Sequence, residues 1–362
     1  MNSNLRHAAE RVAYEPGFLA NDLRVFTEVQ GSTRADAASL LGMYPDRFDE
    51  LALCRTPSRG ERFAGEVRSI ADYAGADARA LANLLRLVDA LLTLASAPNS
   101  DVAPVLAAAR ETALTIAPQQ PKGQGLQPAW LKDAVELLGR HGDAAFPRDI
   151  ELAVLWCLPL AIIELDDLSG ISISAWLSAR DVNLPVHSPP HGLHGALVAF
   201  GGSGVLFLNA GDPPAERRLT VAHEAAHFLV DYWLPRGKVA ARAPALLEVA
   251  DGVRGASPVD HVDSLLARVP FGLHTHLFER DPAGAIPNLG VNEAEQRATQ
   301  VAWELLAPQA AVAARVFTDD EFSLVRTLES EFGLPRESAR EYGKYLRRAL
   351  KRRRGREPFD WS

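Results

Sequence analysis

The sequence predicts an α+β fold that is mostly helical, with an N-terminal all-α domain and a following domain that contains a small antiparallel β-sheet. Leucines and alanines recur at three- and four-residue spacing in the first third of the chain, above all in DARALANLLRLVDALLTLAS at 77–96. That spacing is the period of an amphipathic helix. Further along, LHGALVAFGGSGVLFLNAG at 193–211 holds two β-type apolar runs around a Gly-Gly-Ser-Gly turn, which indicates a hairpin.

The expected elements divide the chain into an all-α regulatory or docking domain at 1–116, a linker at 117–128, a second domain at 129–315 and a basic helical tail at 316–362. Pro, Gly and Gln without an apolar period mark the linker. Two helices, broken at Gly333–Pro335, are expected within 328–355. The other expected helices are 19–30, 34–41, 61–72, 77–96, 129–140, 148–164 and 292–308, besides the helix directly after the hairpin.

The composition narrows the class of protein. The 362 residues are 47% hydrophobic and 23% charged, as in globular proteins, and the net charge of −8 argues against a protein that coats nucleic acid with its whole surface. The start has no apolar core of signal-peptide length, and the apolar run at 152–163 is too short to cross a membrane, so we expect a cytoplasmic protein without a membrane partner. Cys54 and Cys157 lack a C-x-x-C spacing, so any metal has to use other ligands.

The helix after the hairpin carries the sequence RRLTVAHEAAHFLVDYW at 217–233. His223 and His227 stand one turn apart on one face, so they can bind one metal ion, with Glu224 beside them as a general base. The surrounding apolar residues indicate that the helix packs inward, where polar groups lose hydration unless a partner replaces it. The alternative is a pair of core histidines satisfied by hydrogen bonds, with Glu224 capping or pairing locally.

A catalytic zinc site needs a third protein ligand and keeps a fourth position open. Asp231 would lie about 12 Å from His223 along the helix axis, at about 1.5 Å per residue, which is too far to share that metal. The segment NEAEQRATQVAWELLAP at 292–308 reads as a helix with Asn292 as its N-cap, and its apolar face traces back to Glu295. Periodicity therefore selects Glu295 as the acid that points inward.

Two alternatives to this ligand remain. Asn292 and Glu295 also have the spacing of a capping box, in which Glu295 would face solvent. His274 and His276 in LHTHLF could be ligands, because alternate residues of a strand point the same way. We favour Glu295, because a buried carboxylate without a partner is costly and the two histidines supply one.

With the two histidines and Glu295 as ligands of Zn²⁺, the expected reaction is hydrolysis of a peptide bond. The metal would polarise the carbonyl and lower the pKa of a water, and Glu224 would take the proton and pass it to the leaving amine. The hairpin at 193–209 could present an edge strand that holds an extended peptide, or serve only as a structural sheet. Tyr232 and His194 are the candidates for stabilising an oxyanion.

In combination, these pieces resemble the ImmA/IrrE family of metallo-endopeptidases. The hairpin ends in VLFLNAG, RRLTVAHEAAHFL follows, and EAEQRATQVAWELLAP is similar to the family's E-x-x-A-[N/D]-x-F-A-x-x-L-L-x-P segment, with Glu295 in the place of the third zinc ligand. The resemblance covers roughly 150–310 and implies a zincin-like metallopeptidase domain. Thr299, Val301 and Ala307 replace more usual residues, and the segment 234–291 is longer than the family norm, which bears on substrate access.

The resemblance also implies a substrate. Family members are cytoplasmic, and they are thought to cut a helix-turn-helix transcriptional repressor and so release stress-response or mobile-element genes. The competing interpretation is a regulatory DNA- or protein-binding module whose metal site is structural or sensory. Glu224 separates the two, because a structural site needs the three ligands and has no use for this glutamate.

Two segments bear on nucleic acid as a partner. STRADAASLLGMYPDRFDELA at 32–52 has a weak helix-turn-helix register, but its second helix would present three acidic residues with only Arg47, a poor surface for DNA. A docking or regulatory role suits this unit better. The basic tail from Lys344 to Arg354 favours the helix macrodipole and solubility, or alternatively contacts nucleic acid or an acidic partner.

Overall fold

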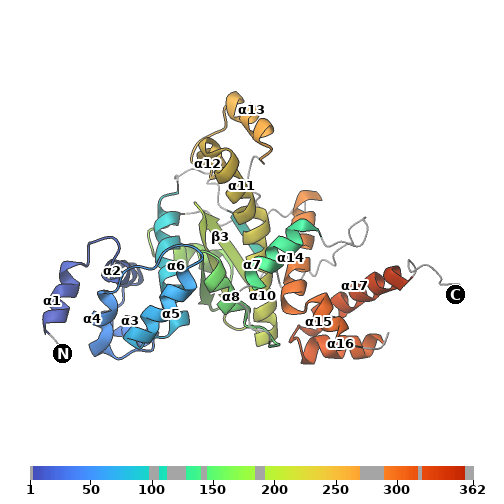
Figure 1. The fold of residues 1–362 in the computed structure, drawn as a ribbon, viewed down its shortest axis with the longest axis horizontal. Helices are drawn as coiled ribbons and strands as arrows, with labels where there is room; N and C mark the ends of the chain where they lie inside the picture. The colour runs from blue at the N-terminus through green and yellow to red at the C-terminus, as the bar shows by residue number, and fades with distance from the viewer. Residues whose placement is uncertain are drawn as a thin grey trace.

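The computed structural model describes residues 3–97, 106–111, 128–139, 145–183, 192–269, 289–316 and 320–354. Within these ranges the protein is α+β and mostly helical, as the sequence predicted, and its strands form a four-stranded sheet at the centre of the molecule (Figure 1). The helices of the first third lie on one side of the sheet, and α14 to α17 lie on the other. Most of the linker segment 117–128, His274 and His276 lie outside the described residues.

The first third begins with a helical region in which the four predicted helices are confirmed. Asp77 starts the longest of them, because its carboxylate accepts a hydrogen bond from the backbone N–H of Ala80. The 32–52 segment forms two short helices with a 3₁₀ turn between them. The helices are α1 (Ser3–Arg11), α2 (Leu19–Gln30), α3 (Arg34–Leu40), the 3₁₀ turn η1 (Pro45–Arg47), α4 (Phe48–Ala52), α5 (Phe63–Ala74) and α6 (Ala78–Ala95).

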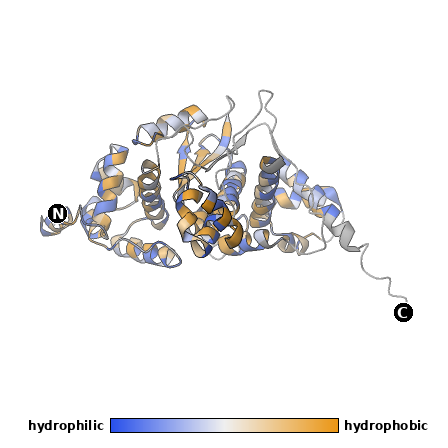
Figure 2. Cartoon of the chain, turned by 90° about the horizontal axis from the view of Figure 1, so that it is seen from above, coloured by the Kyte–Doolittle hydropathy of each residue, from blue (hydrophilic) through white to orange (hydrophobic). Residues whose placement is uncertain are grey.

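The sheet has the strand order β1-β3-β4-β2. Strands β3 and β4 form the predicted hairpin, and β1 pairs with β3, both in antiparallel register. Strand β2 runs parallel to β4, so the sheet is mixed and the prediction of an antiparallel sheet is wrong. Hydrophobic residues follow the strands in Figure 2, as expected for a sheet between layers of helices. The strands are β1 (Leu106–Glu111), β2 (Leu160–Leu165), β3 (Leu193–Phe200) and β4 (Ser203–Asn209).

Two sequence predictions about these strands are wrong. The helix expected at 148–164 ends at Cys157 as α8 (Ile150–Cys157), and β2 follows after Pro159. A buried parallel strand is a continuous apolar run, so periodicity alone does not distinguish it from a buried helix. Strand β1 lies within 1–116, which was predicted to be all-α.

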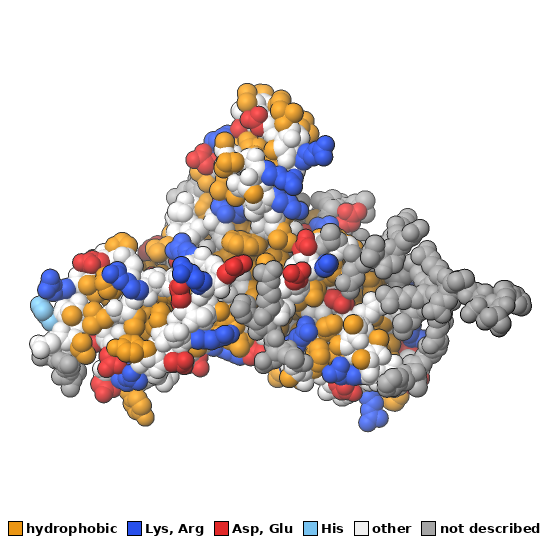
Figure 3. Space-filling model, in the orientation of Figure 1, with side chains coloured by type: hydrophobic (Ala, Val, Ile, Leu, Met, Phe, Trp, Pro, Cys, Tyr) orange, Lys and Arg blue, Asp and Glu red, His pale blue; other side chains and the backbone are white. Residues whose placement is uncertain are grey.

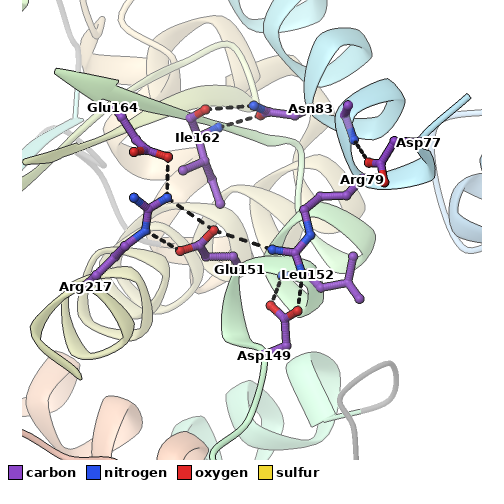
Figure 4. Close-up of polar contacts among 10 residues, drawn as sticks. Asp77, Arg79, Asn83, Asp149, Glu151, Leu152, Ile162, Glu164 and Arg217 are labelled. Atoms are coloured by element: carbon purple, nitrogen blue, oxygen red, sulfur yellow. Dashed lines mark hydrogen bonds and ion pairs between the residues drawn. The ribbon is translucent and has the colours of Figure 1, made fainter. Parts of the chain in front are cut away.

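Helix α6 covers the sheet and is bonded to its outer strand. It packs on β2 and β4. The side-chain amide of Asn83 donates to the backbone oxygen of Ile162 and accepts from its backbone N–H, both at 2.8 Å (Figure 4). The N-terminal helices therefore share one hydrophobic core with the sheet. The division into a 1–116 and a 129–315 domain stays a prediction.

The hairpin leads into α10 (Pro214–His227), which crosses the sheet and packs along α14 (Leu289–Leu306). Arg217 anchors the start of α10 through Glu151 of α8, at 2.6 Å, and Glu164 of β2, at 2.5 Å (Figure 4). Arg217 is partly buried between these two carboxylates, so the pairs fix the helix more firmly than exposed ion pairs would. The remaining helices of this region are α7 (Ala129–Gly139) and α9 (Gly170–Ser178).

Beyond α10 the chain continues through a π-helical turn, η2 (Phe228–Trp233), into an arm that stands away from the sheet (Figure 1). The arm corresponds to the described part of the long 234–291 segment. Hydrophobic side chains gather at its tip in Figure 3, over α13, where Val259, Val262, Leu265 and Leu266 are exposed. The arm consists of α11 (Leu234–Arg242), η3 (Pro244–Leu246), α12 (Leu247–Ala250) and α13 (Pro258–Ala267).

The C-terminal part contains the two predicted tail helices, α16 (Glu321–Ser330) and α17 (Arg336–Arg354), after the short α15 (Gln309–Ala313). Gly333 separates them with a φ of +68°, a conformation that favours glycine. Its carbonyl accepts a hydrogen bond of 2.9 Å from Arg218 of α10, so the tail is tied to the central helix. Across the described ranges, no helix is both long and apolar enough to span a membrane.

Candidate metal centre

Two histidines of α10 and one glutamate of α14 meet between these helices. The Nε2 atoms of His223 and His227 are 3.2 Å apart. Glu295 places one carboxylate oxygen 3.3 Å from Nε2 of His223 and the other 3.7 Å from Nε2 of His227. One potential ligand atom from each residue lies within 4.8 Å of the other two. The structure thus brings together the three residues that periodicity selected, and they could hold a metal ion.

All three side chains are buried, with exposed fractions of 5% for His223, 0% for His227 and 7% for Glu295. Burial opposes protonation of His227, but the hydrogen-bonded carboxylate of Asp231 and the nearby carboxylate of Glu295 outweigh it and raise the pKa of this imidazole to about 10. Burial would raise the pKa of Glu295, yet the two histidines hold it well below its usual range. Without a metal, the two neighbouring carboxylates therefore favour the protonated form of His227.

Asp231 fixes the orientation of the His227 ring. One of its carboxylate oxygens lies 2.9 Å from Nδ1 of His227, and the other accepts a hydrogen bond of 2.7 Å from Arg297 of α14. A proton on Nδ1 that is donated to Asp231 leaves Nε2 with its lone pair toward the cluster, which is the tautomer a metal requires. Asp231 is not among the three clustered residues, as its distance from His223 along the helix predicted, but its contact with His227 was not predicted.

The signal for this role was present in the sequence, because Asp231 stands four residues after His227 and side chains at that spacing meet on a helix. The π-helical turn begins between the two residues, and such turns occur frequently at functional sites. Arg297 lies on α14, whereas Asp231 follows α10 along the chain. No periodicity argument could show that Arg297 faces Asp231, since the pairing joins two separate helices.

Glu224 is fully buried beside strand β3. A Cβ atom at Gly195 of β3 would lie 3.4 Å from Cγ of Glu224 and only 2.2 Å from Cγ2 of Thr220. No ordinary side chain fits in that space, so α10 approaches the backbone of β3 this closely because position 195 is glycine. The approach fixes where the glutamate of the H-E-x-x-H motif stands relative to the sheet.

The two candidates for stabilising an oxyanion, Tyr232 and His194, both have hydrogen-bond partners in the structure. The Tyr232 hydroxyl accepts a hydrogen bond of 2.7 Å from the backbone N–H of Gly202, so it holds the hairpin turn. The His194 ring binds Asp212 at 2.9 Å, at the start of the α10 region. The partners of both side chains are residues other than His223, His227 and Glu295.

Two further expectations about the site are wrong. Helix α14 begins at Leu289, so Asn292 lies inside it and is not the N-cap; its side chain accepts from Gln296 instead. The capping-box alternative for Glu295 therefore does not apply. Neither strand of the hairpin is an edge strand, because β3 lies between β1 and β4 and β4 lies between β3 and β2.

The fold and the site define an α+β protein with a buried cluster of two histidines and a carboxylate, oriented by a second carboxylate. The donor set fits a divalent metal, because imidazole nitrogen and carboxylate oxygen are both common zinc ligands and the His227 orientation is already fixed. Comparison of the chain with models of known families, with curated proteins and with solved structures found no match.

Proposed function

We propose that this protein is a zinc-dependent endopeptidase, with His223, His227 and Glu295 as the ligands and Glu224 as the general base. The observation that carries the proposal is the convergence of three buried ligand atoms within 4.8 Å, directly beside a glutamate in the H-E-x-x-H order. Buried polar groups of this kind are costly unless they bind something specific. A three-ligand site also leaves the fourth position for substrate, as catalytic zinc sites do.

In this proposal, zinc supplies Lewis-acid chemistry, which polarises the scissile carbonyl and makes water more acidic. Glu224 accepts a proton from the water whose oxygen adds to the carbonyl carbon, and it passes that proton to the amine nitrogen as the C–N bond breaks. Asp231 keeps the His227 ring in one tautomer and one orientation. Gly195 allows α10 to stand close to β3, which sets the position of Glu224.

The proposed substrate is a specific protein, and the resemblance to the ImmA/IrrE family favours a helix-turn-helix transcriptional repressor cut in the cytoplasm. DNA binding by the 32–52 segment receives little support from its charges. Asp49 of α4 is buried and paired with Arg34, while Arg47 is paired with Glu50, so these groups serve packing within the helical region. An acidic or nucleic-acid partner of the tail remains part of the proposal only as an alternative.

Elemental analysis tests the metal site first. Protein purified without chelator should contain about one zinc per chain, Glu224→Gln should retain it, and Glu295→Ala should lose or weaken it. Activity is then sought as cleavage of a candidate repressor by the zinc-loaded protein, with Glu224→Gln as the inactive control. A wild-type protein that takes up no zinc even after reconstitution contradicts the proposal.

One observation favours the second candidate, a regulatory module with a structural or sensory metal. Glu224 is 0% exposed and the ligands are almost as buried, which is typical of closed structural sites. The two functions differ in what Glu224→Gln changes. A structural site would keep its metal and its regulatory output in this variant, whereas an endopeptidase would keep the metal and lose cleavage.

A further inference from the structure

Strand β1 covers the only side of β3 that β4 leaves open. It pairs with β3 over its whole length, from Leu106 opposite Ala199 to Glu111 opposite Leu193, with a register shift after Arg110. The ladder is antiparallel, which is the arrangement in which an extended peptide adds to the side of a sheet. A segment of the chain itself therefore takes the hydrogen bonds that β3 could otherwise offer to a peptide.

The covered side of β3 lies beside the proposed general base. Arg110 of β1 stands opposite Gly195, and Gly195 is the residue whose missing Cβ brings β3 against Glu224 and Thr220. The backbone of β1 also lies next to that of α10. A peptide that paired with β3 in place of β1 would thus run past the helix that carries the H-E-x-x-H motif.

The burial of the site is consistent with this occupancy. Glu224 has an exposed fraction of 0%, and the most exposed of the three ligands, Glu295, reaches only 7%. Neither a scissile bond nor a water from bulk solvent reaches the carboxylate of Glu224 in this arrangement. Substrate therefore has to displace part of the protein before it meets these residues.

We propose that β1 is an autoinhibitory strand, which holds the β3 edge in cis and must leave before an extended peptide segment of the substrate takes its place. This inference rests on the proposed peptidase function. Its physical consequence is a reduced apparent affinity for peptide, because only molecules with β1 displaced can bind. A change that releases β1 should strengthen peptide binding, and in the active protein should increase cleavage by the same factor.

The test compares Ala108→Pro with Ala109→Pro, both in a Glu224→Gln background that binds peptide without cutting it. Successive residues of an edge strand direct their N–H groups alternately toward and away from the neighbouring strand, so only one of these prolines removes a hydrogen bond to β3. The probe is a fluorescent peptide with the β1 sequence LAAARE. We expect about tenfold or tighter binding in the variant that releases β1, and binding within about twofold of the parent in the other.

Hydrogen exchange identifies which proline variant has released β1, and zinc content shows that the fold is intact. Released β1 without tighter peptide binding would overturn the inference. A second variant, Ala109→Cys with Ala196→Cys, joins residues that are opposite each other in the β1–β3 ladder. The oxidised form should bind no probe, and reduction should restore the residual binding of the parent; probe binding to the oxidised form would also overturn the inference.

These readouts separate the inference from the function on which it rests. Binding of the probe does not require catalysis. If the variant that releases β1 binds the probe more tightly, but cuts no substrate when Glu224 is kept, the result would contradict the peptidase function alone. Cleavage at the same rate with β1 docked, released or locked by the disulfide would contradict the autoinhibitory role alone.

Discussion

The carboxylate of Asp231 joins the two helices that carry the proposed metal ligands, since it contacts His227 on one side and Arg297 of α14 on the other. Both contacts are shielded, because the Asp231 side chain is only 7% exposed. A carboxylate in this position makes the histidine a stronger and better oriented ligand. Asp231 should therefore have a large effect on zinc affinity, although it is not itself a proposed ligand.

Replacement of Asp231 by Asn tests this role. The amide keeps the size but loses the charge, so we expect zinc affinity to fall by about 10- to 100-fold, as measured by competition with a chromophoric chelator. Asp212→Asn is the matched control, because Asp212 binds the ring of His194, which is not one of the three proposed ligands. An Asp231→Asn protein with the affinity of the control would show that Asp231 has no part in metal binding.

Metal and proton compete for His227. Its pKa of about 10 in the metal-free protein means that this ring carries a proton throughout the neutral range and has to release it to bind zinc. The apparent zinc affinity should therefore rise about tenfold per pH unit as the pH increases from 7 to 9, and fall as the pH decreases. Chelator competition at several pH values measures the slope. A flat profile would mean that His227 is already neutral in the metal-free protein.

Protonation of His227 should also affect the stability of the metal-free protein. As the pH rises, this stability should fall, whereas zinc affinity should rise. The folded-state pKa of His227 lies above the ordinary value of 6.5, so its protonation stabilises the metal-free protein in full below pH 6.5. That contribution is lost as the pH rises from 6.5 toward 10. Urea unfolding of chelator-treated protein should show the loss, and the zinc-loaded protein and a His227→Gln variant should both lack it.

The sequence was sufficient to predict that His223, His227 and Glu295 lie together, because the spacing of the two histidines puts them on one helix face and periodicity points Glu295 inward. It was not sufficient to find the Asp231–Arg297 pair, whose members lie 66 residues apart on different elements. Such a contact depends on how α10 and α14 pack together. Periodicity within one helix contains no information about that packing.

At the scale of elements, the contact between α10 and β3 depends on Gly195. An alanine there would put its Cβ 2.2 Å from Cγ2 of Thr220, so either the helix or the strand has to move. We expect Gly195→Ala to lower the free energy of unfolding by about 1–3 kcal/mol, the usual cost of overpacking a core. Urea unfolding of the metal-free proteins measures it, with zinc affinity as a second readout.

Two further variants make that experiment specific. Gly237→Ala in α11 places a methyl group where no atom lies within 4 Å, and it should leave stability unchanged or raise it by about 0.5–1 kcal/mol. Thr220→Ser removes the methyl group that an alanine at 195 would meet, so the double variant should recover part of the loss. Equal stability of Gly195→Ala and Gly237→Ala would contradict the close-packing explanation.

Element prediction succeeded where the local sequence decides the structure. The helices of the first third and the hairpin have strong periods and turn residues, and they form at the predicted positions. Strand β2 was predicted as the end of a helix because it begins with the wholly apolar run LAII. Strand β1 was missed because it lies in a region where helices dominate. Both strands exist through pairing with partners distant in the sequence, which no local pattern records.

At the scale of the whole molecule, the helical N-terminal region and the sheet depend on each other. Helix α6 has a buried apolar face that includes Leu84, Leu87 and Leu91, and it packs on β2 and β4. Removal of this helix would leave one face of the central sheet open to water. The predicted boundary at 117–128 marks a change of composition, but the packing crosses it.

A shortened protein that begins at residue 129 should therefore be insoluble or bind the dye ANS strongly, because it exposes the face of the sheet that α6 covers. A protein that begins at residue 16 is the control, since it lacks only α1 at the end of the molecule (Figure 1). The soluble fraction and far-UV circular dichroism distinguish the two. A folded, monomeric 129–362 fragment would instead support two separable domains.

The side-chain amide of Asn83 protects the outer side of β2 from pairing with a strand of another molecule. It satisfies both backbone groups of Ile162 that face away from β4, so a strand from another molecule finds no free donor and acceptor at that point. Strand β1 is the last strand on the opposite side of the sheet, and it pairs with β3. If β1 leaves during activation, the edge of the sheet moves from the six-residue β1 to the eight-residue β3, whose unpaired backbone groups any β-prone chain can join. Activation would then carry a risk of self-association, and the open form would be short-lived in concentrated solution unless a substrate fills it.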